Sequence, residues 1–188
     1  MILRDYQRQA IDSLYDWFRK NDTGNPCLVL PTGAGKSVIL AELCRDALSS
    51  WPGTRILILS HVKELLEQDA EKIRILWPDA PLGIYSAGLG CRDVDAITVA
   101  GIQSVYRKAS EIGYVDIAIV DECHLLNHKD EGMYRNLLNE LEAINPSLRV
   151  IGLTATPYRL GHGLITEGGA LFNALIEPVR IGELVERG

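Results

Sequence analysis

A glycine-rich segment near the N-terminus carries the residue types that bind phosphate. Gly33, Gly35, Lys36 and Ser37 follow a short apolar run, and helical periodicity begins directly after them. Glycines let a backbone approach a phosphate closely, and the free N–H groups at a helix N-terminus attract negative charge. In this arrangement Lys36 would reach the outer phosphates of a nucleotide, and the Ser37 hydroxyl would bind Mg²⁺. The segment therefore predicts a nucleotide-binding loop.

A pair of acidic residues follows a later apolar run. Asp121 and Glu122 come directly after 116–120, a segment typical of a buried strand. Asp121 would then lie near the metal ion and Glu122 near an attacking water, which suits hydrolysis of a phosphate bond. Without a phosphate loop, two such carboxylates are more often the start of a solvated loop or a helix cap. With that loop present, we predict Lys36, Asp121 and Glu122 as catalytic residues.

The apolar patterns around these residues predict alternating strands and helices. Short apolar runs indicate buried strands, and apolar residues at helical spacing indicate covering helices. The stripe within 63–77 is mainly apolar but includes Asp69. Such alternation indicates a parallel sheet covered on both faces. The predicted strands are 27–30, 55–60, 96–100, 116–120 and 149–153, and the predicted helices are 6–18, 38–48, 63–77, 102–110, 132–144, 171–176 and 183–187.

Length and charge limit the classes of protein. The chain has 188 residues, close to one domain of about 150 residues, and no run approaches the roughly 20 apolar residues that cross a bilayer. Residues 1–9 lack the apolar core of a secretory signal, so we expect a cytoplasmic chain without a membrane partner. The 19 Lys and Arg against 25 Asp and Glu argue against a broad basic face and permit a local nucleic-acid groove.

The cysteines do not indicate a metal site. Cys27, Cys44, Cys91 and Cys123 never come within a C-x-x-C spacing. Zinc knuckles and redox pairs require close spacing of this kind. We therefore expect reduced thiols and no zinc in this chain.

Three motifs lie where predicted strands end, namely Pro31–Ser37, Asp121–His124 and Leu153–Pro157. Together they resemble the first RecA-like domain of superfamily 2 helicases of the DExH group. The resemblance also explains Leu30, which stands where a general phosphate loop has glycine, because this superfamily commonly uses Pro-Thr-Gly. It implies an α/β fold of the RecA-like P-loop type, a three-layer sandwich with a mainly parallel central sheet and helices on both faces. The implied ligands are ATP or ADP with Mg²⁺.

The same resemblance extends the nucleotide site upstream. Leu3–Ala10 is similar to the adenine-recognition motif, in which Gln7 matches the residue that reads the adenine edge. An amide suits this task because it both donates and accepts hydrogen bonds. Arg4 would pack on the base or meet a phosphate, and a solvated charge at a helix start explains it equally well. The implied nucleotide-binding residues are Arg4, Gln7, Thr32, Gly33, Ala34, Gly35, Lys36 and Ser37, and the implied metal ligands are Ser37 and Asp121.

Two segments, Ser60–Leu65 and Gly101–Val105, resemble motifs that contact a nucleic-acid backbone. Strand ends that open into helix N-termini present N–H groups and hydroxyls to phosphate. For His61 and Lys63 a solvated surface role fits equally well. The implied contacts are Ser60, His61, Lys63, Gln103 and Ser104.

A third segment resembles the Thr-Ala-Thr motif that couples nucleotide state to the grip on nucleic acid. It contains Thr154 and Thr156, separated by Ala155 and followed by Pro157. The hydroxyls would link the carboxylates of the acidic pair to the second half of a motor. The resemblance adds His124 to these coupling residues.

Several motifs, among them Val120–His124 and Gly152–Leu160, look most like those of RadD-type bacterial DNA-repair proteins. The resemblance implies the ATP-binding N-terminal half of a DNA helicase or translocase, because nothing resembles the second RecA-like domain that supplies arginine fingers. We expect residues 1–188 to form one domain, to need a second RecA-like domain or partner chain, and to hydrolyse ATP slowly alone. Open alternatives are a restriction-type translocase, an RNA helicase, a nucleotide-dependent binding module without turnover, and a P-loop kinase.

Overall fold

One large sheet forms the centre of the molecule. The structure is a computed structural model that describes residues 3–126, 128–159 and 163–178. Neighbouring strands of this sheet are parallel, except for one antiparallel pair at an edge. In the described residues its eight strands are β1 (Pro26–Val29), β2 (Ile56–Ser60), β3 (Leu82–Ser86), β4 (Cys91–Arg92), β5 (Ile97–Gly101), β6 (Ile117–Val120), β7 (Arg149–Thr154) and β10 (Ala174–Ile176), in the spatial order β10-β1-β7-β6-β2-β5-β3-β4.

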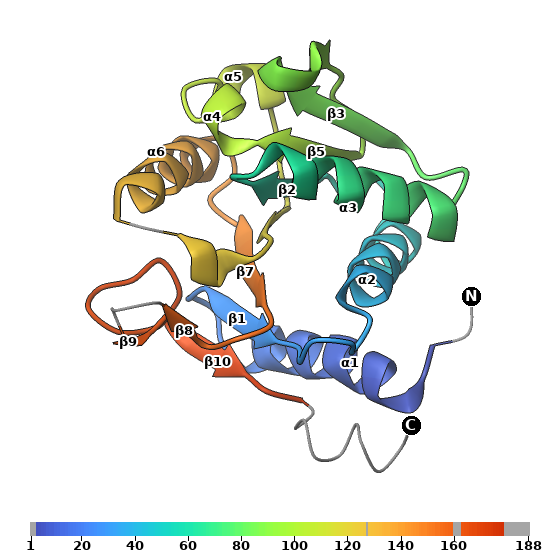
Figure 1. Cartoon of the computed structure of the whole chain (residues 1–188), viewed down its shortest axis with the longest axis vertical. Coiled ribbons are helices and arrows are strands. Elements are labelled where there is room, and N and C mark those ends of the chain that lie inside the picture. The colour runs from blue at the N-terminus through green and yellow to red at the C-terminus, as the bar shows by residue number, and fades with distance from the viewer. Residues whose placement is uncertain (1–2, 127, 160–162, 179–188) are drawn as a thin grey trace.

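Helices cover both faces of this sheet. The α-helices are α1 (Asp5–Lys20), α2 (Lys36–Ser50), α3 (Lys63–Leu76), α4 (Ile102–Val105), α5 (Ala109–Ile112) and α6 (His128–Ile144), and the short 3₁₀ helices are η1 (Ala87–Leu89) and η2 (Cys123–Leu125). Figure 1 shows α1, α2 and α3 on one side of the sheet and α6 on the other. Successive residues of a strand pack on opposite faces of the sheet. Ile58 packs in the core beneath α1–α3, and Leu57 and Leu59 pack in the core beneath α4–α6. The result is a three-layer α/β sandwich.

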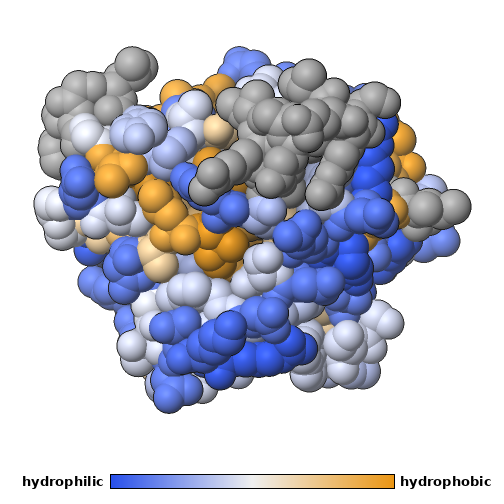
Figure 2. All heavy atoms as spheres, turned by 90° about the horizontal axis from the view of Figure 1, so that it is seen from below, coloured by the Kyte–Doolittle hydropathy of each residue, from blue (hydrophilic) through white to orange (hydrophobic). Residues whose placement is uncertain are grey.

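The sheet edge formed by β10 lies on the lower side of the molecule in Figure 1. Its residues Ala174, Leu175 and Ile176 are half-buried. Figure 2 views this side and shows apolar side chains gathered in one region of a mostly hydrophilic face. A separate antiparallel pair consists of β8 (Tyr158–Arg159) and β9 (Gly163–Leu164).

Most of the predicted elements are confirmed. The five predicted strands form, with ends that move by one residue. The predicted helices 6–18, 38–48, 63–77 and 132–144 also form, and α2 begins two residues earlier than predicted, at Lys36. The sequence patterns did not indicate β3, β4, β8 or β9. The predicted helix 183–187 lies outside the described residues.

The predicted single helix over 102–110 is wrong, because the chain forms α4 and α5 with a break at 106–108. The Lys108 N–H bonds to the Val105 carbonyl, which tightens the turn, and Lys108 has non-helical dihedral angles. The side-chain amide of Asn136 donates to the Tyr106 carbonyl at 2.7 Å. A contact from α6 therefore takes a carbonyl that a continuous helix would use for its own ladder.

The predicted helix over 171–176 is also wrong. Residues Ala174–Ile176 form β10, which pairs in parallel with Pro26–Leu28 of β1. Asn25 holds the chain just before this strand, since its side-chain amide donates to the Leu171 carbonyl and its N–H donates to the Asn173 side chain. A short apolar run is compatible with either element, and here pairing with a distant strand decides the outcome. No described helix has the length and apolar character needed to span a membrane.

Candidate nucleotide-binding site

The carboxyl ends of three neighbouring strands position the residues of the candidate site. Strand β1 leads through Pro31–Gly35 into α2, β6 ends just before Asp121, and β7 ends at Thr154. These strands are neighbours in the order β1-β7-β6 and run parallel. Carboxyl ends of parallel strands meet at one edge of a sheet, which is where ligands of open α/β folds bind. Segments far apart in sequence are therefore brought together.

The loop before α2 has the backbone conformation that its glycines permit. Gly33 and Gly35 have φ angles of 87° and 75°, in the left-handed region. Gly35 is the N-cap of α2, so the first N–H groups of that helix follow directly. A Cβ atom on Gly35 would lie only 2.6 Å from Gln7 Nε2. The positive φ angle favours glycine at position 35, and a larger residue would also displace the Gln7 amide.

Gln7 connects the start of α1 to this loop. Its Oε1 accepts the Arg4 N–H at 3.0 Å, and its Nε2 donates to the Ala34 carbonyl at 3.2 Å. Gln7 is buried, whereas Arg4, just before α1, and Thr32, in the loop, are exposed. Each amide atom of Gln7 has one of its two hydrogen-bonding positions engaged in this way. The assignment of Gln7 to adenine stays a prediction.

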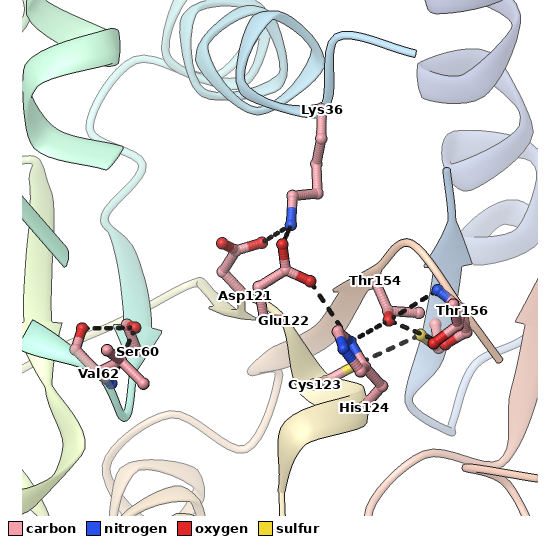
Figure 3. A network of polar contacts seen from close by, with 10 residues as sticks. Lys36, Ser60, Val62, Asp121, Glu122, Cys123, His124, Thr154 and Thr156 are labelled. Atoms are coloured by element: carbon pink, nitrogen blue, oxygen red, sulfur yellow. Dashed lines mark hydrogen bonds and ion pairs between the residues drawn. The ribbon is translucent and has the colours of Figure 1, made fainter. Parts of the chain in front are cut away.

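An ion-pair cluster joins the loop to the acidic pair. Figure 3 shows the Lys36 side chain extending from α2 toward the two carboxylates. Lys36 Nζ lies 3.1 Å from Asp121 Oδ1 and donates a hydrogen bond to Glu122 Oε1. Burial alone would lower the pKa of Lys36, but the negative charges of Asp121 and Glu122 and the hydrogen bond to Glu122 outweigh it, and the net shift is upward. Lys36 is therefore a protonated ammonium held by two carboxylates.

Glu122 has an unusual backbone conformation. Its φ and ψ angles of 46° and 44° lie in the left-handed helical region, and it is the only non-glycine residue with positive φ among those described. This conformation costs an L-residue about 1–2 kcal/mol. Such local strain often occurs at functional sites. Here it turns the chain directly after β6, and the Glu122 side chain meets Lys36.

The predicted coupling residues His124, Thr154 and Thr156 also contact one another. Thr154 Oγ1 lies 2.7 Å from His124 Nδ1, donates to the Thr156 carbonyl at 2.9 Å and accepts the Thr156 N–H at 3.2 Å. Because a hydroxyl has one proton, a Thr154 that donates to Thr156 leaves His124 Nδ1 as the donor to Thr154. The same Nδ1 lies 3.4 Å from Glu122 Oε2. A continuous polar path therefore runs from Glu122 through His124 to the loop after β7 (Figure 3).

The cluster includes one residue, Asp69, that was not predicted from the sequence as a site residue. Asp69 on α3 is 6% exposed, and its carboxyl group interacts with Asp121 and Lys36. Burial, reinforced by the negative charge of Asp121, raises the pKa of Asp69 to about 8. The sequence did contain an indication of this role, because Asp69 stands in an otherwise apolar helix stripe. Carboxylates are rarely buried without a partner.

The predicted nucleic-acid residues lie along the same sheet edge, at β2 and β5. Ser60 and Gly101 are register partners, so the two motifs begin side by side. The Ser60 hydroxyl is buried and bonds within its own turn to Val62, apart from the Lys36 cluster (Figure 3). Ser104 Oγ accepts the Ala87 N–H at 2.9 Å. Of the other three, His61 is half-buried, and Lys63 and Gln103 are exposed.

The oxygen donors of the site fit a magnesium ion that arrives with its nucleotide. No three His, Cys, Asp or Glu side chains converge as a metal site in the described part of the chain. Magnesium in nucleotide enzymes commonly takes only one or two carboxylates, with substrate phosphates completing its shell. Asp121 Oδ1 is buried and accepts no hydrogen bond, although it is ion-paired with Lys36. The Asp121 carboxylate and the Ser37 hydroxyl are donors of the required kind.

Several known proteins are similar to this chain in sequence. Residues 1–159 match the family described as "Type III restriction enzyme, res subunit". The ATP-dependent DNA helicase UvsW of Enterobacteria phage T4 is 29% identical over 168 residues, which cover 86% of this chain and 32% of UvsW. The ATP-dependent RNA helicase DHX58 of Mus musculus is 28% identical over 178 residues, covering 84% of this chain and 25% of DHX58.

Solved structures share the fold of this chain. The crystal structure of T4 UvsW matches with a TM-score of 0.67 and 22% identity, over 96% of this chain and 35% of that chain. The Type ISP restriction-modification enzyme LlaGI, solved with a DNA substrate mimic, matches with a TM-score of 0.69 and 16% identity, over 100% of this chain and 20% of that chain. Across the curated relatives it matches, the chain spans about a quarter to a third of their length. The chain thus belongs to the family described as the res subunit of type III restriction enzymes, with the fold of a first RecA-like domain of superfamily 2 helicases.

Proposed function

We propose that this chain is the ATP-binding half of a superfamily 2 DNA motor, which hydrolyses ATP with Mg²⁺ to move on or remodel DNA. The observation that carries the proposal is the contact between Lys36 of the glycine loop and the acidic pair Asp121 and Glu122. A phosphate cradle and two carboxylates at one sheet edge are the parts that nucleotide hydrolysis requires.

Each residue has a distinct task in this proposal. The N–H groups that follow Gly35 at the start of α2 face the phosphates, and Lys36 exchanges its carboxylate partners for phosphate oxygens. Ser37 and Asp121 would hold Mg²⁺, which, when bound, neutralises phosphate charge. Glu122 orients the attacking water and accepts its proton, a role in which a positioned carboxylate is effective. Gln7 lies beside the loop and contributes to the adenine pocket.

We further propose that residues 1–188 act as a single domain that needs a second RecA-like domain for fast turnover. The lengths of the relatives support this proposal, because the chain spans only about a quarter to a third of each. Arginine fingers supplied by a partner are worth about 10³ to 10⁵ in rate in GTPases. ATP hydrolysis by the isolated chain is therefore expected to be slow.

DNA is the proposed nucleic acid. The names of UvsW and the LlaGI complex favour DNA, and DHX58 provides the RNA alternative. The polar path from Glu122 through His124 to Thr154 supports a coupling of hydrolysis to the nucleic-acid edge. A role in DNA repair, as in RadD-type proteins, belongs to the same proposal.

The test is ATP hydrolysis by the 188-residue chain with Mg²⁺, with and without single-stranded DNA, duplex DNA, forked DNA and RNA. We expect slow hydrolysis that depends on Mg²⁺ and changes little with nucleic acid. Fast, nucleic-acid-stimulated hydrolysis would contradict the half-motor proposal. Transfer of phosphate to a small-molecule acceptor would instead identify a kinase.

A nucleotide-dependent binding module is the second candidate. The observation that favours it is the engagement of Glu122 by Lys36, since a carboxylate held by an ammonium is less available to a water proton. In a hydrolase this contact is broken when Lys36 turns to the phosphates. In a binding module it persists, and substitution of Glu122 leaves any residual hydrolysis unchanged.

A further inference from the structure

Two thiols meet in the core beneath α4–α6. Cys27 lies in β1 and Cys123 in η2, and their Sγ atoms are 3.3 Å apart, close enough for one thiol to donate a hydrogen bond to the other. Both side chains are fully buried in the apolar cluster on that face of the sheet. A buried cysteine behaves as a small apolar residue, so burial alone does not require two sulfur atoms to touch. The close approach therefore has a more specific cause.

The contact between the thiols depends on a glycine in the strand between them. Cys27 of β1 is the register partner of Gly152 in β7, and Gly152 is also the register partner of Val120 in β6. These residues form one row across the sheet. Cys123 comes shortly after Val120, and a Cβ atom added to Gly152 would lie 3.0 Å from Cys123 Sγ. A side chain at position 152 would thus crowd the space through which Cys123 reaches β1.

The thiol pair lies next to the carboxylate that is proposed to activate water. Cys123 stands between Glu122 and His124 in the chain and in space (Figure 3). It belongs to a short 3₁₀ helix that begins directly after the left-handed backbone of Glu122. Cys27, in contrast, lies in a strand that is paired on both sides, with β7 and with β10. A force between the two sulfur atoms would therefore move η2 more readily than β1.

We propose that Cys27 and Cys123 form a reversible disulfide bond that slows ATP hydrolysis by displacing Glu122. The inference rests on the proposed function and adds a redox modification site to it. Hydrogen peroxide oxidises one thiol to a sulfenic acid and is itself reduced to water. The other thiol then attacks the sulfenic sulfur, so that an S–S bond forms, the S–O bond breaks and a second water leaves. A dithiol reductant reverses the change by thiol–disulfide exchange.

Formation of the bond requires movement. The sulfur atoms of a disulfide lie about 2.05 Å apart, so the two thiols must approach by roughly 1.2 Å from their separation of 3.3 Å. Most of this movement falls on η2 and on the adjoining Glu122, because β1 is held from both sides. A displacement of about 1 Å at a reacting group lowers a rate by about 100-fold. Nucleotide affinity should change less, because neither cysteine belongs to the phosphate loop.

The experiment exposes the wild-type chain to hydrogen peroxide for increasing times, alkylates the remaining thiols and maps the cysteines by peptide mass spectrometry. The half-buried Cys91 serves as an internal standard of oxidation. We expect a cross-link between Cys27 and Cys123, which forms more slowly than Cys91 reacts because η2 must first open. Single-turnover hydrolysis of ATP should become about 10- to 100-fold slower, with ADP affinity within about threefold. Dithiothreitol should restore the rate.

Two variants provide the controls. Cys27→Ala removes one thiol of the pair and leaves Cys123 and Glu122 in place, so its rate should equal that of the reduced wild-type chain and should not respond to peroxide. If Cys27→Ala does not fold, Cys27→Ser replaces it, since serine is closer in size to cysteine. Cys91→Ser keeps the pair and should respond to peroxide as the wild-type chain does.

The outcomes separate this inference from the proposed function. Absence of the cross-link after Cys91 is fully oxidised overturns the inference, and so does a cross-link that leaves hydrolysis unchanged. An equal loss of hydrolysis in peroxide-treated Cys27→Ala also overturns it, because the loss then comes from another residue. Failure of the reduced wild-type chain to hydrolyse ATP overturns the proposed function and with it the effect on hydrolysis, whereas the peptide map still decides whether the bond forms.

Discussion

The nucleotide-binding cluster and the nucleic-acid motifs share one sheet edge, but their polar groups are held differently. Asp121 is 2% exposed, and its partner Lys36 contacts both acidic residues. Lys63 and Gln103 are exposed and reach into solvent. Internal ion pairs hold the charged side chains of the first region before any ligand arrives, whereas Lys63 and Gln103 of the second region are exposed to water. Substitutions should therefore have large effects in the first region and small effects in the second.

The largest effect is expected for Glu122→Gln. Loss of the proton acceptor should lower single-turnover hydrolysis of ATP by about 10²- to 10⁴-fold, while nucleotide affinity changes little. Rapid-quench measurement of phosphate release checks this expectation. The control Glu64→Gln changes an exposed glutamate at the start of α3 and should leave the rate unchanged. An unaltered rate in Glu122→Gln would favour the binding module.

Gly35→Ala tests how tightly the loop is packed. A methyl group at this position would meet Gln7 Nε2 at 2.6 Å and would also sit on a positive φ. We expect a loss of about 2–3 kcal/mol in the free energy of unfolding, measured with urea.

Gly53→Ala is the matched control, because Gly53 has a φ of 93° but nothing lies within 4 Å of its added Cβ. In that variant only the strained backbone conformation should lower the free energy of unfolding, by about 1 kcal/mol. Equal losses in Gly35→Ala and Gly53→Ala would show that the contact with Gln7 adds nothing.

Thr154→Val removes one hydroxyl from the polar path. The change keeps the shape of the side chain but leaves His124 and the backbone groups of Thr156 without their partner. The free energy of unfolding should fall by about 1–3 kcal/mol. Thr156→Val, at an exposed position in the same loop, should cost less than about 0.5 kcal/mol. A comparable loss in both variants would contradict the importance of the Thr154 hydroxyl.

The smallest effect is expected for Lys63→Ala. One phosphate contact contributes about 1 kcal/mol to binding of single-stranded DNA. Its removal should also reduce the slope of log affinity against log salt concentration by about one. Fluorescence anisotropy at several salt concentrations measures both quantities. Lys72→Ala, further along the exposed side of α3, is the control. Equal DNA affinity of the two variants would remove Lys63 from the nucleic-acid edge.

The sequence was most informative at the phosphate loop and the acidic pair, because each is a short local motif with a well-defined chemical role. Glycines before a helix and carboxylates after a strand were enough to assign Lys36, Asp121 and Glu122 to one predicted site, and the structure brings the three side chains together. The parallel sheet followed from unbroken apolar strands, because burial on both faces leaves no polar alternation to confuse the pattern.

Features that depend on distant contacts could not be predicted in this way. Residues 174–176 form a strand because β1 offers an unpaired edge, and the helix after β5 breaks where Asn136 of α6 binds a carbonyl. Asp69 was visible as an exception in an apolar stripe, but its neighbour Asp121 comes from a separate strand. Gln7 bonds a loop that follows it by 27 residues, which spacing alone does not reveal.

The most direct measurement is calorimetric titration of ADP with Mg²⁺ into the wild-type chain and the Lys36→Ala variant. We propose that Lys36 exchanges Asp121 and Glu122 for nucleotide phosphates when the nucleotide binds. The wild-type chain should bind one nucleotide, and Lys36→Ala should bind it about 10- to 100-fold more weakly while keeping the circular dichroism of a folded chain. Equal affinity in the two folded proteins, or no binding by the wild type, would contradict the claim.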